Sequence, residues 1–326
     1  MGVPKTFPLE APIRPEARQI GRKAHIDALE SQVVNTEQHT LLFADRHVGK
    51  TSMAWAVLDR IRTSEAGWAL EVNLSHGPVR SSASLAARLA EQARTAHLRI
   101  EPIKDGIWRR GRAAARIAPA TAAAASALGV DIEGVDLPAL ATAVDGALAG
   151  SEDEDTMNLR EVLSAIQVAS ISADRPTIVF VDEVQRLSTS WGSDEDGRDA
   201  QLAIAETMDH AEGRVVFLLA GSERSAVEEL LAEGQPLRRE GMMFEVQPIS
   251  GEDWRHGLAD RFSELNAEIT SERIDQILRA SAGHPQRTMR VCAHVQQIIG
   301  SGMFDVSELV VEQAIERAQG HPSWSD

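Results

Sequence analysis

The chain has a single cysteine, Cys292, so an intramolecular disulfide is excluded. A lone thiol also disfavours a thiolate zinc site, and it fits a reducing compartment. Nowhere do roughly 18 uncharged apolar residues run together, and the N-terminus lacks the apolar core of a signal peptide. These absences predict a soluble, cytoplasmic protein without a membrane span.

Positive charge is in deficit, with 33 Lys and Arg residues against 49 Asp and Glu residues and a net charge of −16. This balance argues against a protein that coats nucleic acid, although it leaves room for a local basic contact. No internal repeat with a period of roughly 20 to 50 residues is visible. The length of 326 residues, 43% of them apolar, suffices for one large or two modest globular domains.

The stretch from Leu41 to Met53 is the most informative part of the sequence. An apolar run breaks into a polar turn and then into helix-forming residues, which predicts a strand, a tight loop and a helix. The turn reads ADRHVGKT from Ala44 to Thr51. It matches the phosphate-binding pattern G-x-x-x-x-G-K-[ST], except that Ala44 stands at the first glycine position.

The residue types of this turn suit a triphosphate. Backbone N–H groups and the start of a helix attract anions, because the helix end carries roughly half a positive charge. Lys50 can reach the β- and γ-phosphates, and the Thr51 hydroxyl can hold Mg²⁺. A methyl group at Ala44 matters only if that position needs a positive φ. The predicted nucleotide contacts of the turn are Arg46, His47, Val48, Gly49, Lys50, Thr51 and Ser52.

A second landmark is the run from Pro176 to Val181, which ends in Asp182 and Glu183. Continuous β-rich apolar residues predict a buried parallel strand whose carboxyl end opens on a ligand crevice. Asp182 is expected to orient Mg²⁺ through water, and Glu183 to polarise a water for attack on the γ-phosphate. The alternative is that the two acids cap the following helix.

A further buried strand, 215–220, is followed by Gly221 and Ser222. Ser222 is the candidate to sense the γ-phosphate or to hold the attacking water. The alternative is an ordinary helix N-cap. The chance occurrence of G-K-T in a plain strand-to-helix turn is the alternative for the phosphate loop, and the pairing of both motifs argues against it.

The remaining chain suggests three parts. Four prolines predict an extended N-terminal segment over residues 1–18, followed by a nucleotide-binding α/β domain over 19–249. Within that domain, residues 101–154 change in composition and indicate an insertion, and a polar loop is expected from Ser190 to Arg198 before a helix that starts at Ala200. Strand signals stop after Pro248, and the helical patterns that predict a small helical domain over 250–326 are 251–266, 271–281, 286–299 and 306–318.

The insertion carries the strongest basic run of the chain. Trp108 stands beside four arginines, Arg109, Arg110, Arg112 and Arg116. An aromatic side chain with several guanidinium groups can grip a nucleic-acid backbone, so a DNA contact is one hypothesis. A solvated helix face is the other. The small-residue stretch 118–130 is too short to span a membrane and is interpreted as a buried or partner-facing hairpin.

Together these pieces resemble an AAA+ ATPase of the origin-recognition-like, archaeal-type and STAND-related branch. The resemblance implies an α/β P-loop NTPase fold with a parallel five-stranded sheet, the AAA+ core, followed by a small all-helical lid domain. Nucleotide would bind between core and lid. The motifs that carry the resemblance are Ile20-Gly21-Arg22 (GR box), Val48-Gly49-Lys50-Thr51 (Walker A), Val181-Asp182-Glu183 (Walker B), Leu219-Ala220-Gly221-Ser222 (sensor 1) and Gly283-His284-Pro285 with Arg287.

The resemblance also implies roles for residues outside the two landmarks. Ile20 and Gly21 would lie near adenine. Pro285 and Arg287 would stand at the sensor 2 position of the lid, with Arg290 as the alternative for the arginine.

Hydrolysis in this family usually takes place between subunits, with an arginine finger from a neighbour. Arg238 or Arg239 stands where that finger is expected, and a rim salt bridge is the alternative. The implied ligands are ATP and Mg²⁺, and the implied assembly is a homo-oligomer.

Three functions follow from this resemblance and from the residues. The first is an ATP-hydrolysing switch or loader that acts on a protein or DNA partner. The second is an ATP-gated binding scaffold with little hydrolysis, suggested by Ala44 and by the need for a finger from a neighbour. The third, a small-molecule P-loop kinase, is disfavoured, because the acidic pair and a helical lid suit mechanical coupling better.

Overall fold

The computed structural model describes residues 7, 12–14, 16–75, 79–100, 158–189, 194–209, 214–222, 224–239, 242–300 and 305–324. The chain divides into two compact units. The lid unit comprises Met1–Ala28, Ala44–Ala56 and Glu245–Asp326, and the sheet unit comprises Leu29–Phe43 and Val57–Phe244. The predicted insertion at 101–154, with Arg109, Arg110, Arg112 and Arg116, lies outside the described residues.

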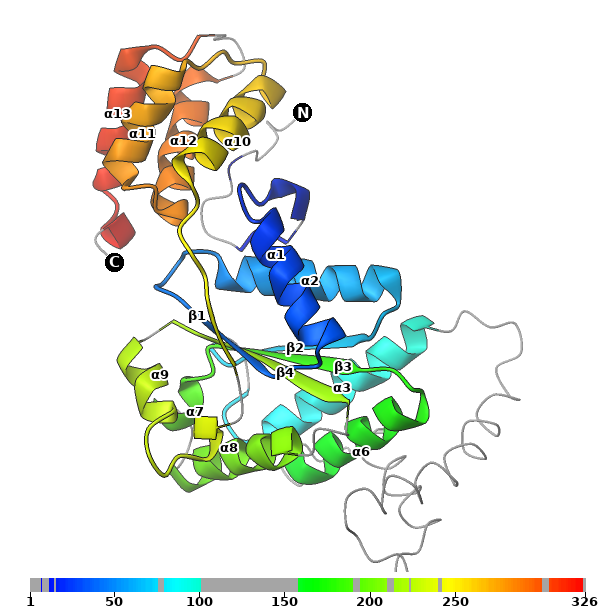
Figure 1. Ribbon diagram of the computed structural model, residues 1–326. Helices are drawn as coiled ribbons and strands as arrows, with labels where there is room; N and C mark the ends of the chain where they lie inside the picture. Colours follow the sequence, from blue (N-terminus) through cyan, green and yellow to red (C-terminus); the bar gives the residue numbers. More distant parts are fainter. Residues whose placement is uncertain are drawn as a thin grey trace, which may run out of the picture. The chain divides into compact units, whose positions relative to one another are not determined.

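Five strands form one sheet in the order β2-β3-β4-β1-β5 (Figure 1). The pairs β2–β3, β3–β4 and β4–β1 are parallel. The two strands with continuous apolar sequences, β3 and β4, are buried along their whole length, as expected for the centre of a parallel sheet. The five-stranded P-loop NTPase sheet is therefore confirmed. The strand bounds are Thr40–Phe43 (β1), Trp68–Asn73 (β2), Thr177–Asp182 (β3), Val215–Gly221 (β4) and Met242–Glu245 (β5).

The strand register brings the carboxyl ends of four strands to one edge of the sheet. Asp182 at the end of β3 lies opposite Asn73 of β2 and Ala220 of β4. Phe43 at the end of β1 lies opposite Gly221 of β4. The segments that follow these strands therefore leave the sheet at the same edge.

One face of the sheet is covered by α3 (Ser82–Ile100), α6 (Leu159–Ser172) and α8 (Asp194–Asp209) (Figure 1). Short helices α7 (Arg186–Thr189) and α9 (Arg224–Leu230) follow β3 and β4. Within the predicted polar loop Ser190–Arg198, the prediction is wrong from Asp194 onward, because α8 starts there and not at Ala200. The carboxylates of Glu195 and Asp196 suit this helix start, and Asp196 Oδ1 also accepts a hydrogen bond from Ser82 N at 3.1 Å.

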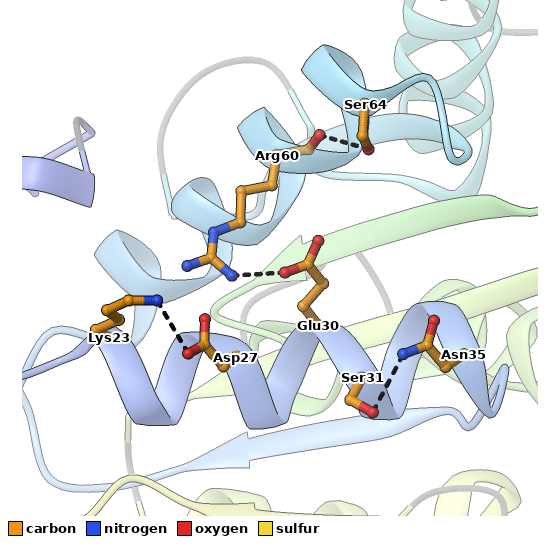
Figure 2. A network of polar contacts seen from close by, with 7 residues as sticks. All are labelled: Lys23, Asp27, Glu30, Ser31, Asn35, Arg60 and Ser64. Carbon is orange, nitrogen blue, oxygen red and sulfur yellow. Dashed lines mark hydrogen bonds and ion pairs between the residues drawn. The ribbon is translucent and has the colours of Figure 1, made fainter.

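The opposite face is covered by the segments of α1 (Lys23–Glu30), the following π-helix η2 (Ser31–Asn35) and α2 (Lys50–Ser64) that belong to the sheet unit (Figure 1). An ion pair joins two of them, with 2.5 Å between Arg60 Nη1 and Glu30 Oε2 (Figure 2). This pair ties α1 to the helix that follows the phosphate loop.

Four helices build the core of the lid unit (Figure 1). They are α10 (Gly251–Glu264), α11 (Ser271–Ser281), α12 (Pro285–Ile299) and α13 (Glu308–Gln319). Each lies within two residues of the predicted range, because most boundaries carry a turn signal. Ser250, Thr270 and Ser307 precede helix starts, and Gly283, Gly300 and Gly320 lie just after the ends of α11, α12 and α13. The predicted helical lid is therefore confirmed.

The N-terminal segment contributes to this core. Phe7 is buried, and its ring centroid lies 5.0 Å from that of Phe262 in α10. Residues Glu16–Arg18 form a 3-10 turn and depart from the extended conformation predicted for them. Cys292 is buried in the same core, and burial raises the pKa of its thiol. In the described part of the chain, no helix is both long and apolar enough to cross a bilayer.

Candidate functional site

The loop between β1 and α2 has the backbone of an anion cradle. Gly49 has φ 102°, and a Cβ built there meets no atom within 4 Å, so this side of the loop is open. His47 also lies in the left-handed region, with φ 62°. Ala44 does not belong to the described residues with positive φ, so its methyl group imposes no backbone strain. The departure from the glycine pattern at Ala44 therefore causes no backbone strain.

Lys50 is buried at the first position of α2. Its Nζ donates to Ala44 O at 2.8 Å and to Asp45 O at 2.7 Å, which closes the loop on itself. The first N–H groups of a helix have no acceptor within the helix, and those of Lys50, Thr51 and Ser52 are in this position. An ammonium group beside such donors is the chemistry that binds phosphate.

Ser52 has a structural contact of its own. Its Oγ accepts a hydrogen bond from Ile13 N at 2.9 Å, and its carbonyl oxygen accepts one from Gln19 Nε2 at 2.7 Å. The Ser52 side chain thus anchors the N-terminal segment to α2. Arg46 and His47 are exposed at the tip of the loop, and Val48 is half-buried.

Arg22 links this loop to the chain that leads into the lid helices. It is 3% exposed, and its guanidinium donates to Val48 O at 2.8 Å and to Gln247 O at 2.5 Å. Burial lowers the pKa of Arg22 to about 10, so the group stays charged at neutral pH. None of the described carboxylates pairs with it. Two backbone carbonyls therefore hold a buried cation beside the phosphate loop.

The dipeptide before Arg22 packs on the first lid helix. Gly21 has φ 63°, and a Cβ there would lie 2.7 Å from Ile249 and 2.8 Å from Asp253, so only glycine fits. Ile20 packs on Gly257 of α10, where an added Cβ would come within 2.6 Å of it. Ile20 and Gly21, the two residues predicted to lie near adenine, thus contact α10 and the residue Ile249 just before it.

The turn between α11 and α12 reaches the phosphate loop. His284 Nε2 lies 3.1 Å from Arg46 O, so this nitrogen carries the hydrogen and donates to the carbonyl. Burial lowers the pKa of His284, and the nearby charges of Arg287 and His47 lower it further. The imidazole is therefore neutral near pH 7 and serves as a contact between lid turn and loop.

Two arginines of α12 differ in their surroundings. The Arg287 guanidinium lies 5.8 Å from the ring centroid of Trp324 and is half-buried. Arg290 is 4% exposed, and its Nη1 has no hydrogen-bond acceptor among the described residues. A buried guanidinium nitrogen without an acceptor is costly. Arg290, named above only as the alternative, thus has the environment of an anion ligand, and Pro285 occupies the first turn of the same helix.

The acidic residues form a second group of functional side chains, at the ends of β2, β3 and β4. Asp182 is 4% exposed; its Oδ2 accepts from Asn73 Nδ2 at 2.9 Å, and its Oδ1 accepts from Glu183 N at 3.1 Å. Glu183 stands in the left-handed region with φ 58°. This uncommon backbone conformation, at a residue expected to be catalytic, is typical of functional sites.

Ser222 lies beside the carboxylate of Glu183. Its Oγ donates to Glu183 Oε2 at 2.7 Å, so the structure brings Glu183 and Ser222 together, while the predicted role of Ser222 toward the γ-phosphate or the attacking water stays a prediction. Gln185 Nε2 donates to the same oxygen at 2.5 Å and lies 3.4 Å from Ser222 Oγ. Sequence reasoning missed Asn73 and Gln185. Their only signal in the sequence is their position. Asn73 stands at the end of β2, beside β3, and Gln185 stands just after the pair Asp182 and Glu183.

The finger candidates lie in the 3-10 turn η6 (Pro236–Arg239). Arg238 is exposed and forms a loose ion pair with Glu233, 3.6 Å from Nη1 to Oε1. The side chain of Arg239 lies outside the described part of the chain. Both residues remain predictions as arginine fingers.

The side chains suit Mg²⁺ held together with a nucleotide. No cluster of three or more His, Cys, Asp or Glu side chains in the described regions could bind a metal by itself. Mg²⁺ in nucleotide sites needs only one or two protein ligands, because phosphates and waters complete its shell. Thr51 and Asp182, the predicted Mg²⁺ ligands, each carry an oxygen of the kind that this chemistry uses, and their role as ligands stays a prediction.

Comparison with known proteins agrees with this geometry. Residues 118–240 match the family described as "ATPase family associated with various cellular activities (AAA)". A search among curated proteins gave no match. Among solved structures, a Walker-type ATPase of Pyrococcus abyssi is similar with a TM-score of 0.59 and 17% identity, over 97% of this chain and 76% of that one.

Two proteins of Aeropyrum pernix are similar to the same extent. Its ORC2 protein, in ADPNP and ADP complexes, aligns with a TM-score of 0.61 and 13% identity, over 97% of this chain and 72% of that one. Its ORC1 protein in complex with DNA aligns with a TM-score of 0.55 and 15% identity, over 97% of this chain and 68% of that one. At such low identity these likenesses establish the fold. The resemblance deduced from the motifs is thus confirmed: residues 118–240 match the AAA ATPase family, and the chain has the fold of an AAA+ P-loop NTPase.

Proposed function

We propose that the protein binds Mg-ATP and hydrolyses it, and that the cycle switches its interaction with a protein or DNA partner. One observation carries the proposal. The phosphate loop begins directly after Phe43, at the edge of the sheet where Asp182, Glu183 and Ser222 end or follow β3 and β4. In open parallel sheets, ligands bind outside the carboxyl ends of the strands, where these residues stand.

Each predicted site residue has a role in the proposed reaction. The helix N-terminus and Lys50 bind the β- and γ-phosphates, and Thr51 and Asp182 hold Mg²⁺ directly or through water. Glu183 accepts a proton from the water that attacks the γ-phosphate. Ser222 and the lid arginine stabilise the charge that spreads over the transferred phosphoryl group.

For the lid arginine, the geometry favours Arg290 over Arg287. Arg287 already has a partner in the Trp324 ring, whereas Arg290 is a buried cation with an unpaired Nη1 among the described residues. A phosphate oxygen would supply the missing acceptor, and charge-assisted hydrogen bonds of this kind contribute about 1.5 to 3 kcal/mol.

Assembly and partner belong to the same proposal. Arg238 is exposed, and an exposed ion pair at 3.6 Å with Glu233 contributes little, so the side chain can turn to a neighbouring subunit. The fold likeness to an ORC1 protein solved with DNA makes DNA a candidate partner of this chain, and the basic run from Arg109 to Arg116 is the proposed contact.

The proposal is tested by measuring phosphate release from Mg-ATP across a range of protein concentrations, with mass photometry on the same samples. We expect slow turnover in dilute protein and a higher rate per subunit once oligomers form, because the finger comes from a neighbour. Oligomers that bind ATP without releasing phosphate at any concentration would instead favour the ATP-gated scaffold. Failure to bind ATP at all would contradict both.

A further inference from the structure

Gln185 stands in contact with the proposed general base, although it belongs to neither motif. Its side chain is completely buried, 2.5 Å from Glu183 Oε2 and 3.4 Å from Ser222 Oγ. A carboxylate oxygen can only accept, so the amide nitrogen of Gln185 must be the atom that faces it. The orientation of the amide is therefore set by chemistry.

The hydrogen bonds to Glu183 are unequal between its two oxygens. Ser222 Oγ and Gln185 Nε2 both donate to Oε2. With Oε2 occupied by two donors, Oε1 is the oxygen left to accept a proton from a water. These two hydrogen bonds favour one orientation of the carboxylate.

Hydrogen bonds hold the backbone around Gln185. Val184 N donates to Ala220 O of β4 at 2.9 Å, and Ser188 Oγ donates to Gln185 O at 2.9 Å. Gly221 leaves room for the amide, because a Cβ there would lie 3.2 Å from Gln185 Oε1 and 2.4 Å from Val227 Cγ2. The backbone of Glu183, with its positive φ, is held within this frame.

We infer that Gln185 is a positioning residue that fixes the Glu183 carboxylate for proton abstraction. This inference rests on the proposed ATP hydrolysis. It predicts that Gln185 acts on the rate of the chemical step and not on nucleotide binding, since its amide nitrogen contacts Glu183 and Ser222. An amide suits the role, because it stays a neutral donor over the whole physiological pH range.

The test uses Gln185→Met, which keeps the length of the side chain and removes both N–H donors. We expect kcat to fall about tenfold or more, because a misplaced base loses much of its contribution. The dissociation constant of a non-hydrolysable ATP analogue should stay within about twofold of the parent value. A kcat that is unchanged, or an affinity that falls in parallel with kcat, would overturn the inference.

A second measurement separates positioning from a general loss of structure. Gln185→Met is introduced into Glu183→Gln, where the base is already gone. If Gln185 acts through Glu183, residual turnover should not fall further, and the effects of the two substitutions should be far from additive. A further drop of the same factor would show that Gln185 acts elsewhere. If the parent protein releases no phosphate in any assembly state, the proposed function itself fails, and this role falls with it.

Discussion

The two groups of candidate site residues hold their charged side chains in different ways. In the lid unit, the cations Lys50 and Arg22 are held by backbone carbonyls of the loop and its neighbours. In the sheet unit, Asp182 and Glu183 are held by side-chain donors from Asn73, Gln185 and Ser222. A phosphate can compete with a carbonyl for a cation, whereas a catalytic carboxylate needs its fixed donors in place.

Because of this difference, we expect the cationic group to control nucleotide affinity and the acidic group to control the rate of hydrolysis. We expect the cationic group to exchange partners when a nucleotide binds, so its substitutions should change affinity. The acidic group is already organised by hydrogen bonds between side chains, so its substitutions should change the rate of hydrolysis while affinity persists.

The largest effect is expected for Glu183→Gln. Removal of a general base typically costs about 10²-fold to 10⁴-fold, so kcat should fall at least about 100-fold, while ATP still binds. Phosphate release under saturating Mg-ATP measures it. Glu229→Gln, at an exposed position of α9, is the matched control and should leave kcat unchanged. Turnover at the parent rate in Glu183→Gln would refute the role assigned to this carboxylate.

The two arginines of α12, Arg287 and Arg290, should differ in their effect on ATP binding. Arg290→Met should weaken ATP binding about tenfold or more, whereas Arg287→Met should weaken it less. Without nucleotide, Arg290→Met should not lower the free energy of unfolding and is expected to raise it, because a buried cation whose Nη1 has no acceptor among the described residues is removed. Equilibrium binding and urea unfolding of both variants check these outcomes. A larger loss of affinity in Arg287→Met would restore Arg287 to the sensor 2 position.

His39 and His284, one in each unit, should make the stability of the fold depend on pH in the same direction. Burial lowers the pKa of His39 in the sheet unit and of His284 in the lid unit. Their unfolded forms therefore bind protons more readily than their folded forms. Stability is complete above about pH 6.5, and it falls as the pH drops through that value toward the lowered pKa.

Urea unfolding at several pH values measures this dependence. His39 Nδ1 accepts from Phe217 N at 3.1 Å and Nε2 faces Met208 O at 3.0 Å, so protonation breaks the first contact. His39→Gln should flatten the slope of stability against pH. His256→Gln, at an exposed position of α10, should leave that slope unchanged. A slope that persists in His39→Gln would assign the dependence to other groups.

The smallest effect concerns the ion pair between α1 and α2. Arg60 and Glu30 are 23% and 30% exposed at the side chain, so Glu30→Gln should cost about 0.5 to 1 kcal/mol of unfolding free energy. The helical pair Lys23–Asp27 is more exposed, and Lys23→Ala should cost less (Figure 2). Thermal unfolding of the two variants side by side decides between them. An equal cost would mean that the link between α1 and α2 adds nothing beyond local helix pairing.

The sequence predicts the elements that carry strong local signals. Buried strands such as Thr177–Asp182 are continuous apolar runs, and the lid helices have turn residues at both ends, so both were predictable. The start of α8 was not, because an acidic run reads as a loop unless its position at a helix N-terminus is known.

Site residues follow the same logic. Lys50, Asp182 and Glu183 stand in spaced motifs, so the sequence names them. Gln185 and Arg22 act through buried contacts with residues far away along the chain, such as Ser222 and Gln247, and no local pattern encodes those distances. The harmless geometry of Ala44 likewise depends on a φ angle that composition does not reveal.

We propose that the cationic group controls nucleotide affinity and that the acidic group controls the rate of hydrolysis. Calorimetric titration of a non-hydrolysable ATP analogue with Mg²⁺ into three proteins tests this most directly. The parent and Glu183→Gln should bind with the same dissociation constant, within about twofold, whereas Lys50→Ala should bind at least about tenfold more weakly because the phosphates lose a charge-assisted contact. Absence of binding to the parent protein, or equal binding by Lys50→Ala, would contradict a triphosphate held by the loop after β1.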